Sequence, residues 1–292
     1  MGWFGKTILV MGLCLSFWGC EQTSQNQTNR QRTKLVLTGS STVAPLANEL
    51  GKKFESQNPG IRVDVQTGGS SRGFADVSQG LNDLGMVSRD LSDDEKFEFQ
   101  DWAIAKDGLA IIVHQDNPIT SLSDRDVVDI YRDQTNNWQD FAGHDGAITV
   151  VNKAEGRSTL ELFLKYFDLE NSEIQADVVI GDNQQGIKTV TGNPNAIGYV
   201  SIGAAEQEIA KGTPIKLLAM DGVEATTENI KNGSFPLSRT LNLVSKDGLN
   251  DLAQEFIEFA QSPEAYEVVE SQSFVPLDII PQVQAQDPPP QS

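Results

Sequence analysis

The chain has 292 residues, of which 38% are hydrophobic and 22% charged, a composition typical of a globular protein with one large or two ordinary domains. Its formal net charge of −19 argues against nucleic acid or an anionic membrane surface as a partner, because both repel an acidic chain. A small anion is still compatible with this charge, since local N–H dipoles, hydroxyls and arginines determine such a site.

The first 20 residues form a targeting segment. Lys6 precedes a short apolar run over residues 8–18 that ends at Gly19 and Cys20. The pattern resembles a bacterial lipoprotein signal, which predicts a signal peptide over 1–20 and lipidation of Cys20. An ordinary signal peptide or an uncleaved anchor is the alternative. With Cys20 at the mature end, the folded part contains no cysteine and needs no disulfide.

Polar residues over 21–33 follow Cys20 and predict a tether between a membrane surface and the folded part. At the other end, residues 282–292 include three consecutive prolines and predict a disordered tail.

Between these ends, strands alternate with helices. Strands are expected at 35–37, around Val63 and Val65, and in the segments DLGMV, LAIIVH, AITVV and AIGYV, while FPLSRTLNLVSK is a strand or a connector. Helices are expected over Leu46 to Phe54, after the Gly68–Gly73 loop, from near Ser92, after Ser123, over Leu160 to Phe167, over Leu252 to Phe259 and after Ser262. Leu46, Leu50 and Phe54 share one helical face, and Ser123 is placed as an N-cap. This order predicts an α/β fold with a largely parallel sheet, and its two runs predict two lobes with a cleft between them.

Four loops combine hydroxyls with free backbone N–H groups at the carboxyl ends of these strands. They are Ser40–Val43, Ser70–Ser71, Ser88–Arg89 and Gly156–Thr159. A helix start leaves up to four N–H groups unpaired and carries about half a positive charge, so several of them together suit a tetrahedral oxyanion. Each loop taken alone is also explained by ordinary N-capping.

A hydrolase is the competing interpretation. Gly69 to Gly73 fits the G-x-S-x-G pattern of a nucleophile elbow, with Ser71 as nucleophile and His144 as base. The elbow would lie on the second strand, which is early for that fold. Phosphate-loop, dinucleotide-binding and zinc motifs do not occur, so no cofactor and no metal are expected.

Five ordered motifs resemble the phosphate-binding proteins of bacterial ABC transporters, most of all the cyanobacterial type. They are LTGSSTVAPL, QTGGSSRGFADVSQG, DLGMVSRDL, the stretch NNWQDFAG to AITVVNKAEGRSTLELF, and NAIGYVSIG. The resemblance covers about residues 34–281. It implies the two-lobed periplasmic-binding-protein fold of type II, with phosphate held between the lobes and two hinge crossings.

The resemblance also implies a ligand set. In the first lobe, Thr42, Val43 and Ser70 match phosphate contacts of the family, and Ser41 lies beside the first two. Ser88 and Arg89 follow the third strand and are expected to hold the ligand as well. In the second lobe, Arg157, Ser158 and Thr159 match a stretch that the family usually writes Ser-Gly-Thr.

Two departures from the family affect selectivity. Lys153 stands where many members have an arginine that clamps phosphate, so Arg157 is a candidate for that role. Ser88 and Arg89 fall where some members place an aspartate that accepts the proton of hydrogen phosphate. Asp90 and Glu155 are the candidates to replace it; without either, discrimination against sulfate or arsenate stays open.

Together these patterns predict a lipid-anchored binding protein, monomeric and without catalytic activity, at the periplasm or cell surface. It captures inorganic phosphate and delivers it to the permease of an ABC importer. The lobes are expected at 34–115 with 239–281 and at 116–238, with crossings near 114–118 and 235–240. A binding protein for another oxyanion, a phosphate sensor or scavenger, and a secreted serine hydrolase are the alternatives.

Overall fold

The computed structural model describes residues 1–2 and 33–277, and residues 33–277 belong to one compact unit. The expected signal peptide, Cys20, nearly all of the tether and the C-terminal tail lie outside the described residues. Among the described residues, no helix is long and apolar enough to cross a membrane.

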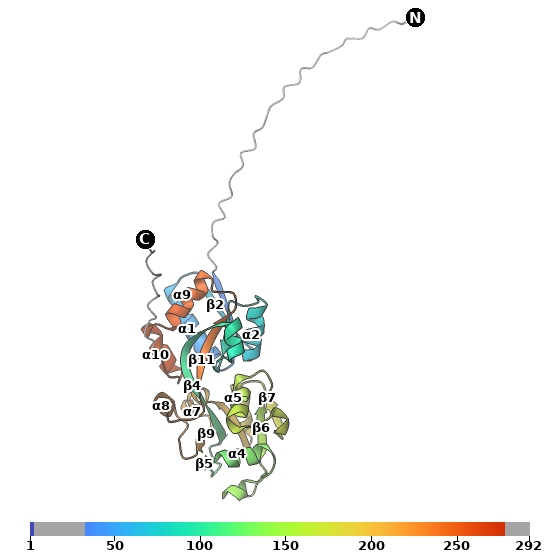
Figure 1. The fold of residues 1–292 in the computed structure, drawn as a ribbon, viewed down its shortest axis with the longest axis vertical. Coiled ribbons are helices and arrows are strands. Elements are labelled where there is room, and N and C mark those ends of the chain that lie inside the picture. Colours follow the sequence, from blue (N-terminus) through green and yellow to red (C-terminus); the bar gives the residue numbers. More distant parts are fainter. Residues whose placement is uncertain (3–32, 278–292) are drawn as a thin grey trace, which may run out of the picture. The chain divides into compact units, whose positions relative to one another are not determined.

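Elements from both ends of the described chain build the first lobe (Figure 1). They are β1 (Lys34–Gly39), α1 (Ala44–Gln57), β2 (Arg62–Thr67), α2 (Ser70–Ser78), β3 (Leu84–Val87), α3 (Asp93–Glu98), the first part of β4 (Gln100–His114), β11 (Ser238–Ser245), α9 (Asp251–Ala260) and α10 (Pro263–Ser271).

The middle of the chain builds the second lobe. Its elements are the last part of β4, β5 (Ser121–Leu122), α4 (Asp124–Tyr131), η1 (Trp138–Phe141), β6 (Thr149–Lys153), α5 (Ser158–Phe167), η2 (Asn171–Glu173), β7 (Val178–Ile180), α6 (Asn183–Gly192), β8 (Ala196–Ser201), α7 (Ile202–Ala210), β9 (Ile215–Leu217), β10 (Ala219–Met220) and α8 (Thr227–Lys231).

Local sequence signals account for many element ends. Ser92 and Ser123 cap α3 and α4 with complete capping boxes, and Leu46, Leu50 and Phe54 are the buried face of α1, as the spacing predicts. After β8 the chain continues as α7, where the sequence indicated only a turn. The Ser201 hydroxyl starts this helix by accepting from the N–H of Ala204.

One nine-stranded sheet runs through both lobes in the order β2-β1-β3-β11-β4-β8-β6-β7, with β9 also paired to β4. Residues 100–108 of β4 pair with β11, whereas residues 109–114 pair with β8 and β9. The partner change lies between Gly108 and Leu109, and the N–H of Leu109 donates to the carbonyl of Leu237, 2.9 Å away. The two crossings therefore lie side by side.

This pairing differs from the expected first crossing near 114–118. The apolar run 109–114 resembles the end of a first-lobe strand, but its partners are second-lobe strands. We therefore propose that the first lobe spans 34–108 and 238–277 and the second lobe 109–237.

Each lobe has its own apolar core. In the first, α1 packs on α9, with the rings of Phe54 and Phe256 edge to face at 5.4 Å. In the second, Phe163 of α5 stacks on Tyr199 of β8 at 4.1 Å. Because β1, β2 and β3 are parallel, and β6, β7 and β8 are parallel, each lobe collects its strand-to-helix loops at one edge.

Candidate anion-binding site

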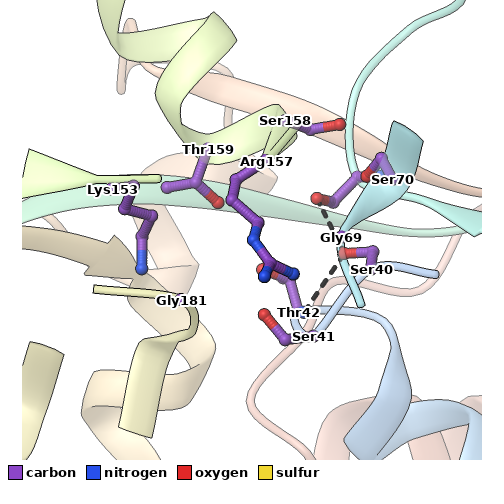
Figure 2. A pocket seen from close by; sticks show the side chains of 11 residues that line it. Ser40, Ser41, Thr42, Gly69, Ser70, Lys153, Arg157, Ser158, Thr159 and Gly181 are labelled. Atoms are coloured by element: carbon purple, nitrogen blue, oxygen red, sulfur yellow. Dashed lines mark hydrogen bonds between the residues drawn. The ribbon is translucent and has the colours of Figure 1, made fainter. Parts of the chain in front are cut away.

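A small polar cavity lies between the strand-to-helix loops of the two lobes (Figure 2). Its walls are Ser40, Ser41, Thr42, Gly69, Ser70 and Ser88 from the first lobe and Lys153, Arg157, Ser158, Thr159 and Gly181 from the second. The space available to the centre of a water molecule inside it is only about 10 Å³. The cavity therefore suits one small ion and not a sugar or a peptide.

Four helices begin at this cavity. The segments that lead into α1, α2, α5 and α6 each supply wall residues. The positive ends of four helix dipoles therefore converge on one point, which favours a bound anion.

Three of these four helices lack a side-chain cap. The first turns of α1, α2 and α5 have no side-chain cap hydrogen bond, while Asp182 caps α6. Serine, threonine and asparagine caps are present at α3, α4, α7, α8 and α9. The uncapped turns leave N–H donors available for a ligand, so the loop hydroxyls are not ordinary N-caps at these helices.

The first-lobe hydroxyls form a connected network. Ser40 Oγ donates to Ser88 Oγ at 2.9 Å and accepts from the N–H groups of Thr42 and Val43. The N–H of Ser88 donates to Ser70 Oγ at 3.4 Å. Ser40, Thr42, Ser70 and Ser88 are all buried, so packing and hydrogen bonds hold these groups in place before a ligand arrives.

The second lobe contributes cations with unpaired atoms. Among the described residues, Lys153 Nζ, Arg157 Nε and Ser158 Oγ are buried without a hydrogen-bond partner. Burial, together with the nearby Arg239 and Arg157 charges, lowers the pKa of Lys153 to about 7, although Asp182 acts in the opposite direction. A bound anion would satisfy all three atoms.

Arg239, at the second position of β11, lies behind the cavity. Its guanidinium binds the buried Asp107 through Nε at 3.0 Å and Nη2 at 2.7 Å. It also donates through Nη1 to Thr159 Oγ1 at 2.9 Å and through Nη2 to Thr42 Oγ1 at 3.3 Å. One side chain at the crossing thus contacts wall residues of both lobes.

Arg239 fixes the direction of two wall hydroxyls. Thr42 Oγ1 also accepts from Asn183 Nδ2 at 3.1 Å, so its two lone pairs are occupied and its proton is left to donate. Thr159 Oγ1 likewise accepts from Arg239. Both threonines line the cavity, and their hydroxyls are arranged as donors to an anion.

The two lobes are in close contact at Gly69. Its backbone has φ +95°, and a Cβ there would lie 2.5 Å from the carbonyl oxygen of Gly156 and 2.8 Å from Arg157 Cδ. The N–H of Ser71 also donates to that carbonyl, at 3.3 Å. Only glycine fits this position when the two lobes are in contact.

The structure brings together seven of the nine expected ligand residues. Ser41, Thr42, Ser70, Ser88, Arg157, Ser158 and Thr159 line the cavity. Val43 does not, because its side chain belongs to the first-lobe core and its N–H is directed to Ser40.

Arg89 also lies elsewhere. Its guanidinium forms a fork with the Glu95 carboxylate, at 2.6 and 2.8 Å, and its Nε donates to Glu161 of the second lobe. Burial alone lowers the pKa of Arg89, but the two carboxylates outweigh it and raise the pKa above its usual value. Arg89 therefore joins the lobes beside the cavity and does not line it.

The carboxylates suggested as proton acceptors are also outside the cavity. Asp90 is exposed and lines a different hollow, and Glu155 is exposed with its carboxylate accepting from Asn171 Nδ2 at 3.2 Å. No aspartate or glutamate of the described chain is among the wall residues.

The elbow serine has no base. Ser71 is exposed and does not line the cavity. The Nε2 atom of His144 lies 2.6 Å from Oδ1 of Asn195, which directly precedes β8, and among the described residues His144 forms no hydrogen bond with Ser71. The arrangement is not that of a nucleophile with its general base.

Sequence reasoning missed Gly181, Asn183, Arg239 and Asp107. A short apolar strand followed by Gly181-Asp182-Asn183 is a helix-start signal of the same kind as the other loops. Arg239 has a weaker signal: a single charge at the start of the apolar segment TLNLV, with its partner Asp107 just before another apolar run. Nothing in the sequence links these two residues.

Comparison with protein families gives a match over most of the chain. A model described as a PBP superfamily domain matches residues 24–264. The phosphate-binding protein PstS of Bacillus subtilis is 28% identical over 248 residues, covering 83% of this chain and 80% of that protein.

Two solved structures share the two-lobed fold. A phosphate-bound protein of Clostridium perfringens, assigned as a phosphate ABC transporter substrate-binding protein, has a TM-score of 0.78 and 30% identity and covers 84% of this chain and 99% of that one. An ABC-type phosphate transport receptor of Vibrio cholerae has a TM-score of 0.67 and 28% identity and covers 82% and 99%.

Proposed function

Because the chain belongs to the PBP superfamily, together with phosphate-binding proteins of bacterial ABC transporters, we propose that it captures inorganic phosphate and delivers it to an ABC importer. The ligand is held between the lobes and released unchanged when they separate. The protein then acts as a binding protein and not as an enzyme.

The observation that carries this proposal is the convergence of four helix starts on one small cavity. Three of the helices are uncapped, and Lys153 and Arg157 are the charged wall residues. Hydroxyls and N–H groups approach from both lobes, which suits the four oxygens of a tetrahedral anion. The positive cavity lies in a chain of net charge −19, so local geometry sets the ligand.

Sulfate is the second candidate ligand. Hydrogen phosphate carries a proton that a carboxylate can accept, whereas sulfate does not, so a wall carboxylate would exclude sulfate. The described wall residues include no carboxylate. Selectivity must then come from other groups, and direct competition between the two anions decides which ligand the cavity prefers.

We further propose that Cys20 carries a lipid and that residues 21–33 tether the lobes outside the cytoplasm, where the chain works as a monomer beside the importer. The signal-like residues at the start of the chain support this location. Mass spectrometry of the membrane fraction tests it. Acyl chains on Cys20 are expected, and cleavage at another position without acylation would contradict the anchor.

Calorimetry on residues 32–292, which include both lobes, tests the ligand. Bound anion is first removed by partial unfolding and dialysis, and phosphate, arsenate and sulfate are then titrated separately. One-to-one binding with phosphate tighter than sulfate supports the proposal. Equal or tighter sulfate binding would favour sulfate as the ligand of the cavity. If none of the three anions binds, the proposed anion site is refuted.

Variants separate the binding protein from the hydrolase. Arg157→Ala removes a wall cation and is expected to weaken anion binding about 10- to 100-fold. His144→Ala is the matched control, because its ring contacts Asn195 in the second lobe and not the cavity. An esterase activity that disappears in His144→Ala would favour the hydrolase.

A further inference from the structure

Lys153 is a buried wall cation whose ammonium is unpaired within the described part of the chain. It lies at the end of β6, is only 3% exposed and lines the cavity, and its Nζ has no hydrogen-bond partner among the described residues. A buried ammonium without acceptors is costly, because it loses hydration and gains nothing in return. Such burial favours the neutral amine.

The charged groups around Lys153 reinforce this preference. Arg157, before α5, and Arg239, on β11, both act against a further positive charge, and Asp182, before α6, favours it. Arg239 is itself neutralised by Asp107 at 2.7 Å, while Asp182 Oδ1 is occupied by the N–H of Gln185. The net balance lowers the pKa of Lys153 to about 7.

The neighbouring strand adds no compensating charge. Tyr199 of β8 accepts from the backbone N–H of Lys153 and donates to Asn152, and burial raises its pKa above its usual value, so it remains a neutral phenol. A bound anion would supply the negative charge that this strand does not provide.

We propose that Lys153 gains a proton from solvent when a dianionic oxyanion enters the cavity, so that capture of the anion and protonation of this one side chain are a single coupled event. The amine becomes an ammonium, and no bond of the ligand forms or breaks. The inference rests on the proposed function only in requiring a tetrahedral anion in this cavity, and it holds for sulfate as well as phosphate.

The coupling predicts a pH dependence of affinity with a definite sign. Below about pH 7 the lysine is already charged in the ligand-free protein, so it adds no pH dependence to the anion affinity. Above that pH, and below the raised pKa of the occupied state, affinity for a dianion falls about tenfold for each pH unit because each binding event must take up one proton. Anions therefore bind tightly in neutral or acidic surroundings and are released more easily in alkaline ones.

Counting protons by calorimetry tests this. Sulfate is titrated into residues 32–292 at about pH 8.5 in two buffers of different ionisation enthalpy, because sulfate carries no proton of its own and any uptake belongs to the protein. About 0.9 proton per bound anion is expected for the unmodified chain. Phosphate, also a dianion at this pH, is titrated in parallel.

Two variants at the site identify the residue. Lys153→Arg keeps a charge at every pH, so binding persists and proton uptake falls to about zero. Lys153→Met removes the titrating group, so uptake is also lost and binding weakens. Lys188→Met, on the exposed side of α6, is the matched control and keeps the full uptake.

The outcomes separate the two proposals. Binding without proton uptake in the unmodified chain would overturn the role of Lys153 while leaving the anion site intact. Uptake that persists in Lys153→Arg would assign the proton to another group and would also overturn it. Tighter sulfate than phosphate binding, with one proton taken up, would change the proposed ligand and support the coupling.

Discussion

Removing the guanidinium of Arg239 tests how the crossing between the lobes is stabilised. The side chain is 1% exposed and its partner Asp107 is fully buried, with 2.7 Å between Arg239 Nη2 and Asp107 Oδ2. Arg239→Met keeps much of the aliphatic length and removes the charge. The carboxylate of Asp107 would then be a buried anion without its counter-ion.

The magnitude follows from what Asp107 keeps. Its Oδ1 still accepts from Ser201 Oγ at 3.0 Å and from the N–H of Gly203 at 3.2 Å, but Oδ2 loses both of its donors. Breaking one side of a buried ion pair costs about 3–5 kcal/mol, because the remaining charge is uncompensated. We expect the free energy of unfolding to fall by that amount.

A second substitution isolates the charge. Asp107→Asn retains an oxygen for Ser201 and Gly203 and carries no charge, so the double variant with Arg239→Met should recover about half of the lost stability or more. The control is Arg125→Met, which breaks a pair with Asp129 on the exposed face of α4, where the arginine side chain is 88% exposed. Its effect should stay within about 0.5 kcal/mol.

Urea unfolding of the ligand-free protein, followed by circular dichroism and tryptophan fluorescence, measures these differences. Coincident transitions with unchanged m-values are required for the comparison. A loss below about 1 kcal/mol for Arg239→Met would refute the reasoning. So would a double variant less stable than Arg239→Met alone, since it would show that the buried charge is not the origin of the cost.

Three further outcomes are expected. Gly69→Ala places a Cβ 2.5 Å from a facing carbonyl oxygen and should weaken anion affinity, measured by calorimetry, at least about tenfold. Gly80→Ala, also at positive φ but with nothing within 4 Å of the added Cβ, should leave the affinity unchanged. Equal effects of the two substitutions would exclude the clash. Burial lowers the pKa of Lys153 from 10.5 to about 7. The buried charge therefore lowers the free energy of unfolding of the ligand-free protein by its full amount below pH 7, and this destabilisation is relieved as the pH rises to 10.5. Lys153→Met should therefore exceed the unmodified chain in unfolding free energy by on the order of a few kcal/mol at about pH 6, with the advantage disappearing near pH 10, and a constant difference would contradict the pKa. Ser70→Ala should weaken anion binding about tenfold and Ser71→Ala by less than about twofold, because only the first lines the cavity; the reverse order would favour the elbow interpretation.

Hydroxyls at strand ends and the periodicity of the helices were readable from the sequence. The α/β class follows from the alternation of apolar strands with helices such as α1, whose buried face Leu46, Leu50 and Phe54 is evident from spacing alone. The loops that supply Thr42, Ser70 and Thr159 are equally local features, although each of them alone is also explained by ordinary N-capping.

Arg89 shows where prediction from the neighbouring sequence fails. Its position after a strand, next to Ser88, is the same as that of a ligand, and the sequence does not say which neighbour its guanidinium will bind. Glu95 lies one helical turn into the next element and Glu161 lies 72 residues away in the other lobe. The distribution of charges in space, not the loop motif, decides that Arg89 joins the lobes.

The sequence by itself determined the fold class, the loops and most of the cavity wall, because each depends on residues close together in the chain. Only the tertiary structure decided that β4 changes partners at Gly108, that Arg239 and Asp107 meet across 132 positions, and that Lys153 finds no acceptor among the described residues. These features depend on contacts between distant segments, and burial acts on a charge only after those segments have packed.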